Sequence, residues 1–343
     1  MRLIALAFIC FALLCSPVAA SAQDASPYRK LQALDGQLAT IGYRLATANA
    51  PLCDRLDGAT GLQLHDIAQY RDRAAIDGVF AFESPVEVEA VVPGSPGQAA
   101  GIAPGDALAT IGVGAAATPI AAFADGLEED PYSRIQRIAD LFATARAAGA
   151  SIRLELLRAG QPLSFTLAPV PACAGRFQLL IKDGLDAGGG GSAQMVNVNL
   201  PLVQYALEDG GGNGEGELAA VVAHELAHNI LHHHERLNAV DIDRGPLRGF
   251  GKNGRRIRAT EEEADRLSVW LLANAGYDPA GAVRFWTRFG KEHGQGLFTE
   301  GTHYRWQKRV AQIEEEIAAL PSAETRGIAR VPPILTHPLP PLE

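Results

Sequence analysis

The spacing of apolar residues in the N-terminal half predicts one long helix followed by short strands. Leucine or isoleucine recurs at three- and four-residue intervals between residues 31 and 45, which predicts a helix over residues 27–48. Over residues 86–92, apolar positions alternate with polar or acidic ones, the pattern of a half-buried strand. This half therefore combines one amphipathic helix with a region rich in short strands.

The C-terminal half has mainly helical spacing. Residues 217–231 are rich in Ala, Leu and Val, which favour a helix, and residues 260–272 and 309–317 repeat an apolar helical pattern. One strand is expected over residues 195–203, after the glycine-rich stretch 184–191, which predicts a loop. The pattern as a whole predicts an α+β protein whose β-rich part precedes a mainly helical part.

Two further strands and a helix complete the β-rich part. A helical stretch over residues 134–147 is followed by strands over 152–157 and 163–167, joined by a turn at Gly160. Gly and Pro cluster before and between these elements, as expected for connecting turns.

The first 22 residues have the pattern of an export signal. Arg2 supplies a positive charge, residues 3–14 are apolar, and small residues stand at 20–22. An apolar stretch of this length is too short to span a bilayer, which needs roughly 20 residues. We expect cleavage after Ala22 and a mature protein that is periplasmic or secreted.

Composition narrows the range of partners. Acidic residues outnumber basic ones by 39 to 30, and the formal net charge is −9. No basic excess offers a surface for a phosphate backbone, so nucleic acid is not an expected partner. The most apolar later stretch, residues 218–231, contains His224, Glu225 and His228, so no integral membrane segment is expected in the mature chain. Composition does not determine the oligomeric state.

Two cysteines, Cys53 and Cys173, remain after removal of the signal. In an oxidising compartment such a pair can form a disulfide, and two buried free thiols are the alternative.

The β-rich part resembles a known peptide-binding domain. Residues 91–111, VVPGSPGQAAGIAPGDALATI, combine a Gly/Pro turn, a short Ala-rich helix and a Pro-Gly-Asp turn. This segment resembles PDZ domains of the bacterial protease type over residues 77–170. The resemblance implies binding of extended peptides by strand addition. It also implies that Gly78, Val79 and Phe80 form the carboxylate-binding loop, whereas the alternative is that they belong to a plain first strand.

A metal-binding pattern stands within the apolar helix of residues 217–231. His224 and His228 are four residues apart, so both imidazoles lie on one helix face, as a tetrahedral Zn²⁺ site requires. Glu225 lies one step further round the helix, within reach of a zinc-bound water. It is therefore the candidate general base for attack of that water on a carbonyl group.

A third protein ligand is needed, and two candidates compete. His234 has the metzincin spacing, but that pattern needs a Gly where Leu231 stands and a methionine turn after the motif. The other candidate is Glu261, which shares a helix face with Asp265 four residues later. We therefore expect Glu261 to bind the metal and Asp265 to hydrogen-bond a ligand histidine.

The two motifs together resemble the M48 family of zinc metallopeptidases over residues 175–320. The resemblance implies a mainly helical gluzincin fold and one Zn²⁺ per chain. It also implies a small sheet whose edge strand, here residues 195–199, aligns the substrate. Thr302-His303 resembles a Thr-His pair that precedes the last helix in this family. His303 is accordingly expected near the metal as a catalytic residue, and Tyr304 is a weaker candidate for the same role.

Two polar segments near these motifs have simpler interpretations. His232, His233 and His234 at a helix end are typical of a solvated cap, and the alternative for His233 is that it matches a histidine that follows the turn in the M48 family. The basic stretch over residues 244–258 is interpreted as a solvated loop near the cleft, with substrate steering as an alternative.

Five segments are therefore expected. They are a signal peptide (1–22), a helical segment (23–76), a PDZ-like domain (77–170), an M48-like metalloprotease domain (175–320) and a Pro-rich extended tail (321–343). The predicted function is a zinc-dependent endopeptidase that acts on unfolded or extended polypeptides of the cell envelope. The alternative is a latent protease that serves as a periplasmic chaperone or peptide-binding protein.

Overall fold

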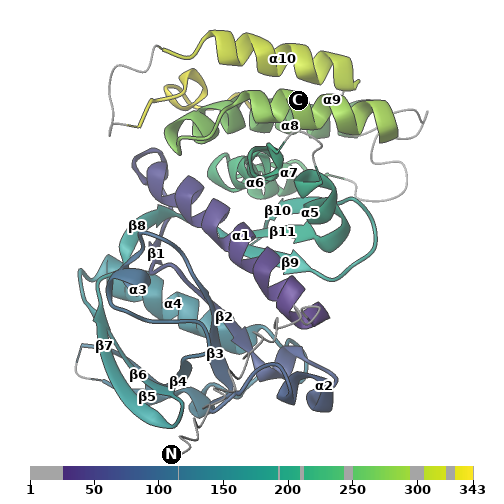
Figure 1. Ribbon diagram of the computed structural model, residues 1–343. Coiled ribbons are helices and arrows are strands. Elements are labelled where there is room, and N and C mark those ends of the chain that lie inside the picture. The colour runs from purple at the N-terminus through teal and green to yellow at the C-terminus, as the bar shows by residue number, and fades with distance from the viewer. Residues whose placement is uncertain are drawn as a thin grey trace, which may run out of the picture.

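The protein has an α+β structure with helices gathered at one end and a large sheet at the other (Figure 1). The computed structural model describes residues 26–114, 116–191, 194–208, 212–242, 250–293, 305–321 and 329–342. The expected signal peptide, residues 1–22, lies outside this range.

Helix α1 (Pro27–Ala48) has the bounds that the apolar spacing predicts. The Ser26 side chain accepts a hydrogen bond from the Arg29 amide, and Pro27 occupies the first turn, where a missing N–H costs nothing. Its buried face, which includes Leu38, Ile41 and Leu45, contacts both the helical part and the sheets. Figure 1 shows α1 running diagonally between the two ends of the molecule.

The large sheet has six strands. Five form the order β2-β3-β4-β6-β7, and β5 (Thr118–Pro119) pairs with β4. The five are β2 (Leu62–Asp66), β3 (Val86–Val91), β4 (Ala107–Val113), β6 (Ile152–Arg158) and β7 (Gln161–Leu167). All of these pairs are antiparallel. The β6–β7 turn contains Gly160 at φ +72°, a conformation that glycine adopts without a steric penalty.

Helix α4 (Ser133–Ala147) covers this sheet, and buries Ile138 and Phe142 in the same apolar cluster as strands β3, β4 and β6. The shorter helices α2 (Arg73–Asp77) and α3 (Pro96–Ala99) lie in connections between strands. Single 3-10 turns are η1 (Ala50–Leu52), η2 (Ile67–Gln69), η3 (Ile120–Ala122) and η4 (Pro333–Leu335).

Two sequence expectations for this region need correction. Strand β3 is not half-buried, because Glu87 and Glu89 are buried as fully as the valines that alternate with them. The sheet also begins before residue 77, since β2 pairs with β3. The burial of β2 does not alternate along the strand, because Leu64, His65 and Asp66 are all buried.

The expected carboxylate-binding loop is not arranged to bind an anion. Gly78, Val79 and Phe80 follow α2, and the amides of Val79 and Phe80 both donate to the Ile76 carbonyl. The Phe80 side chain is buried against the His65 ring. These amides complete a helix end, so they do not offer the free donors that a carboxylate requires.

A disulfide joins Cys53 to Cys173, two positions 120 residues apart. It lies beside a two-stranded sheet formed by β1 (Leu56–Ala59) and β8 (Val170–Cys173), which run antiparallel. The bond therefore connects the end of the α1–η1 segment to the strand that follows the large sheet.

The small sheet has the order β10-β11-β9. Its strands are β9 (Arg176–Leu180), β10 (Ala187–Gly190) and β11 (Met195–Asn199). The expected edge strand, residues 195–199, is the central strand, and β10 forms an edge within the stretch expected to be a loop. A Gly-rich strand has no alternating pattern, which explains why the sequence did not reveal it. The strand also ends at Asn199, where α5 (Leu200–Leu207) begins, and does not continue to Val203.

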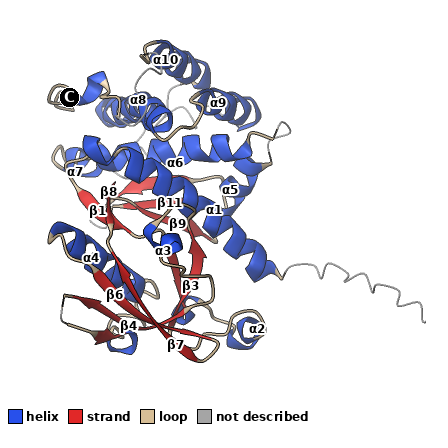
Figure 2. Cartoon of the chain, turned by 60° about the vertical axis from the view of Figure 1, so that its left-hand side comes forward, coloured by secondary structure: helices blue, strands red, loops and turns tan. Residues whose placement is uncertain are grey.

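The remaining helices pack around the small sheet and one another. They are α6 (Gly214–Ile230), α7 (His233–Asn238), α8 (Gly251–Asn274), α9 (Ala280–His293) and α10 (Trp306–Ala318). In Figure 2, α6 lies over β11 and β9, and α8, α9 and α10 lie beyond it. Residues 251–258, expected in a basic loop, form the first turns of α8; residues 243–249 are outside the described range.

The Pro-rich tail makes specific contacts where it is described. Asn274 accepts from the Arg330 amide, Arg236 donates to the Pro340 carbonyl, and Leu342 is buried. Part of the described tail therefore packs on the helices, and it contains the 3-10 turn η4. Among the described residues, none of the helices is long and apolar enough to cross a membrane.

Candidate metal centre

Helix α6 carries the two histidines of the metal-binding pattern. From Glu217 to Ala227 its residues are all less than 10% exposed, so the polar groups of His224 and Glu225 lie in an apolar environment. The helical repeat brings the Nε2 atoms of His224 and His228 to 3.2 Å from each other. Both imidazoles therefore face one point.

Glu261 reaches the same point from the middle of α8. Its carboxylate oxygens lie 3.3 Å from His224 Nε2 and 3.6 Å from His228 Nε2. Because α8 begins at Gly251, the acidic residues 261–263 are not in a first turn, and their position is set by packing of α8 on α6. Three side chains that the sequence places in two separate motifs thus converge.

The donor set fits a zinc ion. Two imidazole nitrogens and one carboxylate lie within 4.8 Å of one another, and a His₂Glu set is one of the common catalytic zinc ligand sets. Burial lowers the pKa of His228 well below its usual value, which favours the neutral imidazole that a metal ligand requires. The three side chains would hold the ion through His224 Nε2, His228 Nε2 and the Glu261 carboxylate.

His233 supports the second ligand. Its Nδ1 lies 2.8 Å from His228 Nδ1, and its Nε2 lies 3.0 Å from a Glu263 oxygen, which also binds Arg236. The contact with His233 occupies Nδ1 of His228 and leaves Nε2 of His228 for the metal. The interpretation of residues 232–234 as a solvated cap is wrong for His233, which is 1% exposed. It is buried because His232 adopts φ +53° and turns the chain back against α8.

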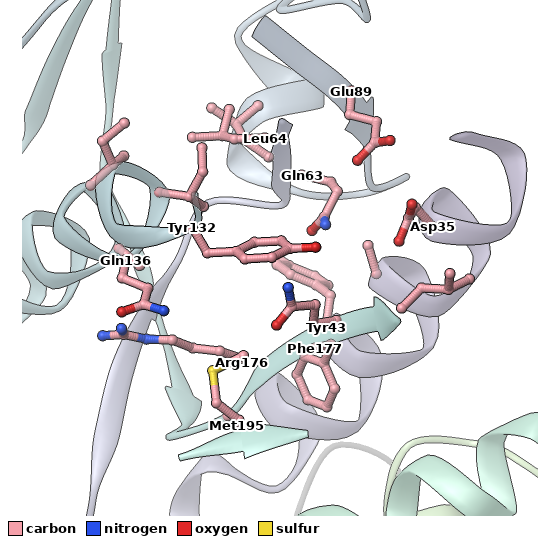
Figure 3. A pocket seen from close by; sticks show the side chains of 18 of the residues that line it. Asp35, Tyr43, Gln63, Leu64, Glu89, Tyr132, Gln136, Arg176, Phe177 and Met195 are labelled. Carbon is pink, nitrogen blue, oxygen red and sulfur yellow. The ribbon is translucent and has the colours of Figure 1, made fainter. Parts of the chain in front are cut away.

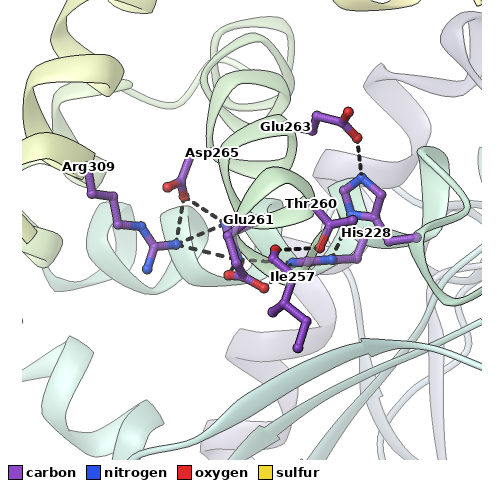
Figure 4. Close-up of polar contacts among 9 residues, drawn as sticks. His228, Ile257, Thr260, Glu261, Glu263, Asp265 and Arg309 are labelled. Carbon is purple, nitrogen blue, oxygen red and sulfur yellow. Dashed lines mark hydrogen bonds and ion pairs between the residues drawn. The ribbon is translucent and has the colours of Figure 1, made fainter. Parts of the chain in front are cut away.

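Asp265 and Arg309 support the first ligand. An Asp265 oxygen lies 2.8 Å from His224 Nδ1 and accepts a hydrogen bond of 2.6 Å from Arg309 Nη2. Burial alone would raise the pKa of Asp265, but the charges of Arg309 and His224 lower it below its usual value. The Arg309 guanidinium also lies 3.2 Å from the centre of the Trp286 ring, a cation–π contact. Figure 4 shows Arg309 directed toward Asp265 and Glu261.

Glu225 lies beside this centre. Its side chain is buried next to the edge strand β10, and the Gly189 amide donates a hydrogen bond to its carboxylate. Burial raises the pKa of Glu225 to about 7, which is suited to accepting and releasing a proton near neutral pH. A Cβ atom at residue 189 would lie 2.2 Å from the Glu225 carbonyl oxygen, so only glycine allows this approach of strand and helix.

Replacement of Asp265 by Asn should weaken metal binding by about 10- to 100-fold. The Asn amide is uncharged, whereas the Asp265 carboxylate carries a negative charge that orients His224 and pairs with Arg309. Competition with a chromophoric zinc chelator would measure this change. Glu314→Gln on the exposed face of α10 is the matched control and should leave the affinity unchanged. An unchanged affinity in Asp265→Asn would show that the carboxylate does not support the ligand.

Two expected site residues, His303 and the weaker candidate Tyr304, lie outside the described residues. Two others, Glu263 and Arg309, were not anticipated, and His233 was considered only as the alternative to a solvated cap. One signal was available for Arg309, because it stands in line with the apolar residues Ile313 and Ile317 of α10. A charged residue in an apolar helical stripe indicates a buried partner.

The donor set and the adjacent glutamate define a site of the metal-dependent hydrolase class. Over an alignment of 134 positions, the chain is 33% identical to the mitochondrial metalloendopeptidase OMA1 of Schizosaccharomyces pombe. The match covers 33% of this chain and 39% of the relative, so the chain spans well under half of the protein that it matches. No family model matches the chain. The similarity supports a metallopeptidase related to the M48 group, in agreement with the His-His-Glu cluster.

Proposed function

We propose that this chain is an exported zinc-dependent endopeptidase of the M48 type that cleaves unfolded or extended polypeptides of the cell envelope. The observation that carries the proposal is the convergence of His224, His228 and Glu261 beside the buried carboxylate of Glu225. The similarity to a metalloendopeptidase supports the same reaction class.

A zinc ion at the three donors would supply Lewis-acid polarisation of the carbonyl group and increase the acidity of water. The protein's own contribution is proton transfer and orientation. Glu225 takes a proton from the attacking water as its oxygen bonds to the carbonyl carbon. The same carboxyl group then passes the proton to the amine that leaves when the C–N bond breaks.

Two parts of the structure are suited to hold an extended substrate. Strand β10 ends the small sheet beside Glu225, so a chain aligned along it would bring a peptide bond close to the carboxylate. Among the described strands, β2 ends the order of the large sheet, so its outer edge is a second candidate for strand addition. We propose that the large sheet belongs to a PDZ-like domain that presents chains to the metal centre.

The proposed organisation keeps the expected order of segments, but the PDZ-like domain starts before residue 77. A signal peptide over residues 1–22 directs the chain to the periplasm or outside the cell. The PDZ-like domain begins with β2, and the metalloprotease segment over 175–320 follows it. The disulfide between Cys53 and Cys173 is consistent with an oxidising compartment.

The proposed function is tested by measuring metal content and cleavage together. Purified chain should contain about one zinc per molecule and cut reduced, carboxymethylated lactalbumin at internal bonds, identified by mass spectrometry. Folded lactalbumin is the control and should resist cleavage. A chain that binds the unfolded substrate without cutting it, with zinc present, would contradict the proposal and favour the latent, chaperone-like alternative.

A further inference from the structure

A cavity of about 490 Å³ lies between α1, the β2 end of the large sheet, α4 and the small sheet. Its walls come from parts of the chain that are distant in sequence, from Tyr28 in α1 to Met195 in β11. The volume is within the range of sites for small organic ligands or a few residues of an extended peptide. None of its lining residues belongs to the metal centre.

Two carboxylates lie at one end of this cavity (Figure 3). Glu89 of β3 is 6% exposed and Asp35 of α1 is largely buried. Asp35 accepts a hydrogen bond from the Leu179 amide. Among the described residues, no Lys, Arg or His forms an ion pair with either carboxylate, and no hydrogen bond to the Glu89 carboxylate is present.

This arrangement differs from that of the other buried acids. Apart from Glu225 at the metal centre, the other buried carboxylates have a basic partner: Glu87 lies 3.8 Å from His65, and the rest pair with a guanidinium (Asp66–Arg134, Asp106–Arg158, Glu217–Arg288, Asp265–Arg309 and Glu316–Arg266). Burial raises the pKa of Asp35 to about 7 and that of Glu89 well above its usual value, and the charge of Asp35 raises the pKa of Glu89 further. A buried pair of this kind is costly unless a positive charge accompanies it.

The surrounding side chains suit an organic cation. Tyr70 and Tyr132 line the cavity; burial raises the pKa of each phenol, and the nearby Asp35 and Glu89 carboxylates raise it further. Figure 3 shows the Tyr132 ring inside the cavity with its hydroxyl directed toward the acidic end. Aromatic faces attract alkylammonium groups, and phenol oxygens accept their hydrogen bonds.

We propose that this cavity binds a primary ammonium group, with Asp35 and Glu89 as its counter-ions and tyrosine rings as its walls. The group is carried either by a free alkylamine or by the lysine side chain of an extended peptide. A divalent metal ion fits less well, because Ca²⁺ takes six to eight oxygen ligands and the acidic end offers two carboxylates. The inference goes beyond the proposed protease function and does not rest on it.

The test is calorimetric titration of the full chain carrying Glu225→Gln, a background chosen to prevent hydrolysis of the probes. The probes are 1,5-diaminopentane and the capped peptide acetyl-Gly-Lys-Gly-amide, and the same peptide with norleucine in place of lysine is the uncharged control. We expect at least one charged probe to bind and the norleucine peptide not to bind. Asp35→Asn and Glu89→Gln should each weaken binding at least tenfold.

Two controls separate recognition from folding and from general charge attraction. Both substitutions remove a buried carboxyl that lacks a cation, so neither should lower the melting temperature of the free chain. Glu129→Gln removes an exposed acid and should change the affinity less than twofold. Binding of the lysine peptide alone identifies a peptide ligand, and binding of the diamine alone identifies a small amine.

Three results would overturn the inference: no binding of either charged probe, equal binding of the norleucine peptide, or binding that neither cavity variant weakens. Binding of Ca²⁺ that both variants abolish, without binding of the amines, would also overturn it and assign an inorganic cation to the cavity. The experiment measures amine binding in a chain that lacks its proposed general base. A negative binding result therefore contradicts the cavity proposal and leaves the proposed protease function untouched.

Discussion

Glu225→Gln is expected to lower kcat for peptide hydrolysis by about 10²- to 10⁴-fold while zinc stays bound. The amide has nearly the same shape as the carboxyl group and can still lie beside the Gly189 amide in β10. It cannot accept a proton from water, so the general-base step is lost. The measurement is kcat on an unfolded protein substrate, together with zinc content by atomic emission.

A matched control comes from the neighbouring acid motif. Glu262→Gln changes one carboxyl to an amide one step along α8 from Glu261, at a position that points away from the donors. This variant should keep both zinc and activity. If Glu225→Gln retains activity with zinc bound, another residue is the base.

Replacing both Cys53 and Cys173 by Ser should lower the free energy of unfolding by up to about 5 kcal/mol. The bond closes a loop across a separation of 120 residues, so its removal restores a large conformational freedom to the unfolded chain. Cys173 is 1% exposed, and a buried hydroxyl in its place adds a smaller cost. Urea denaturation followed by tryptophan fluorescence would measure the difference.

Reduction provides the control for this second prediction. A reducing agent should lower the urea midpoint of the unmodified chain to a similar extent and leave the midpoint of the double variant unchanged. If the oxidised and reduced chains unfold at the same urea concentration, the disulfide does not contribute to stability.

The local parts of the site followed from the sequence. His224 and His228 lie in one helix, where a separation of four residues brings side chains together whatever surrounds the helix. The same rule placed Glu261 and Asp265 on one face of α8. Helix α1 was predictable for a similar reason, since its apolar stripe and its Ser-Pro start are local signals.

The supporting residues did not follow from local patterns. His233 depends on a left-handed residue at 232 and on Glu263 from α8, while Arg309 reaches Asp265 across 44 residues. Strand β10 consists of Ala and three Gly, a composition that predicts a loop; pairing with β11 and close contact with α6 make it a strand. The cavity acids have no sequence signal at all, because they come from α1 and β3.

The sequence by itself therefore determined the expected reaction class and the pairs of site residues that share one helix. The tertiary structure alone decided which strand lies beside Glu225 and which groups orient the histidines. It also decided where Asp35 and Glu89 come together without a cationic partner among the described residues. The physical reason is the distance along the sequence over which each interaction acts. Helical periodicity acts over a few residues, whereas burial and charge pairing depend on which distant segments pack together.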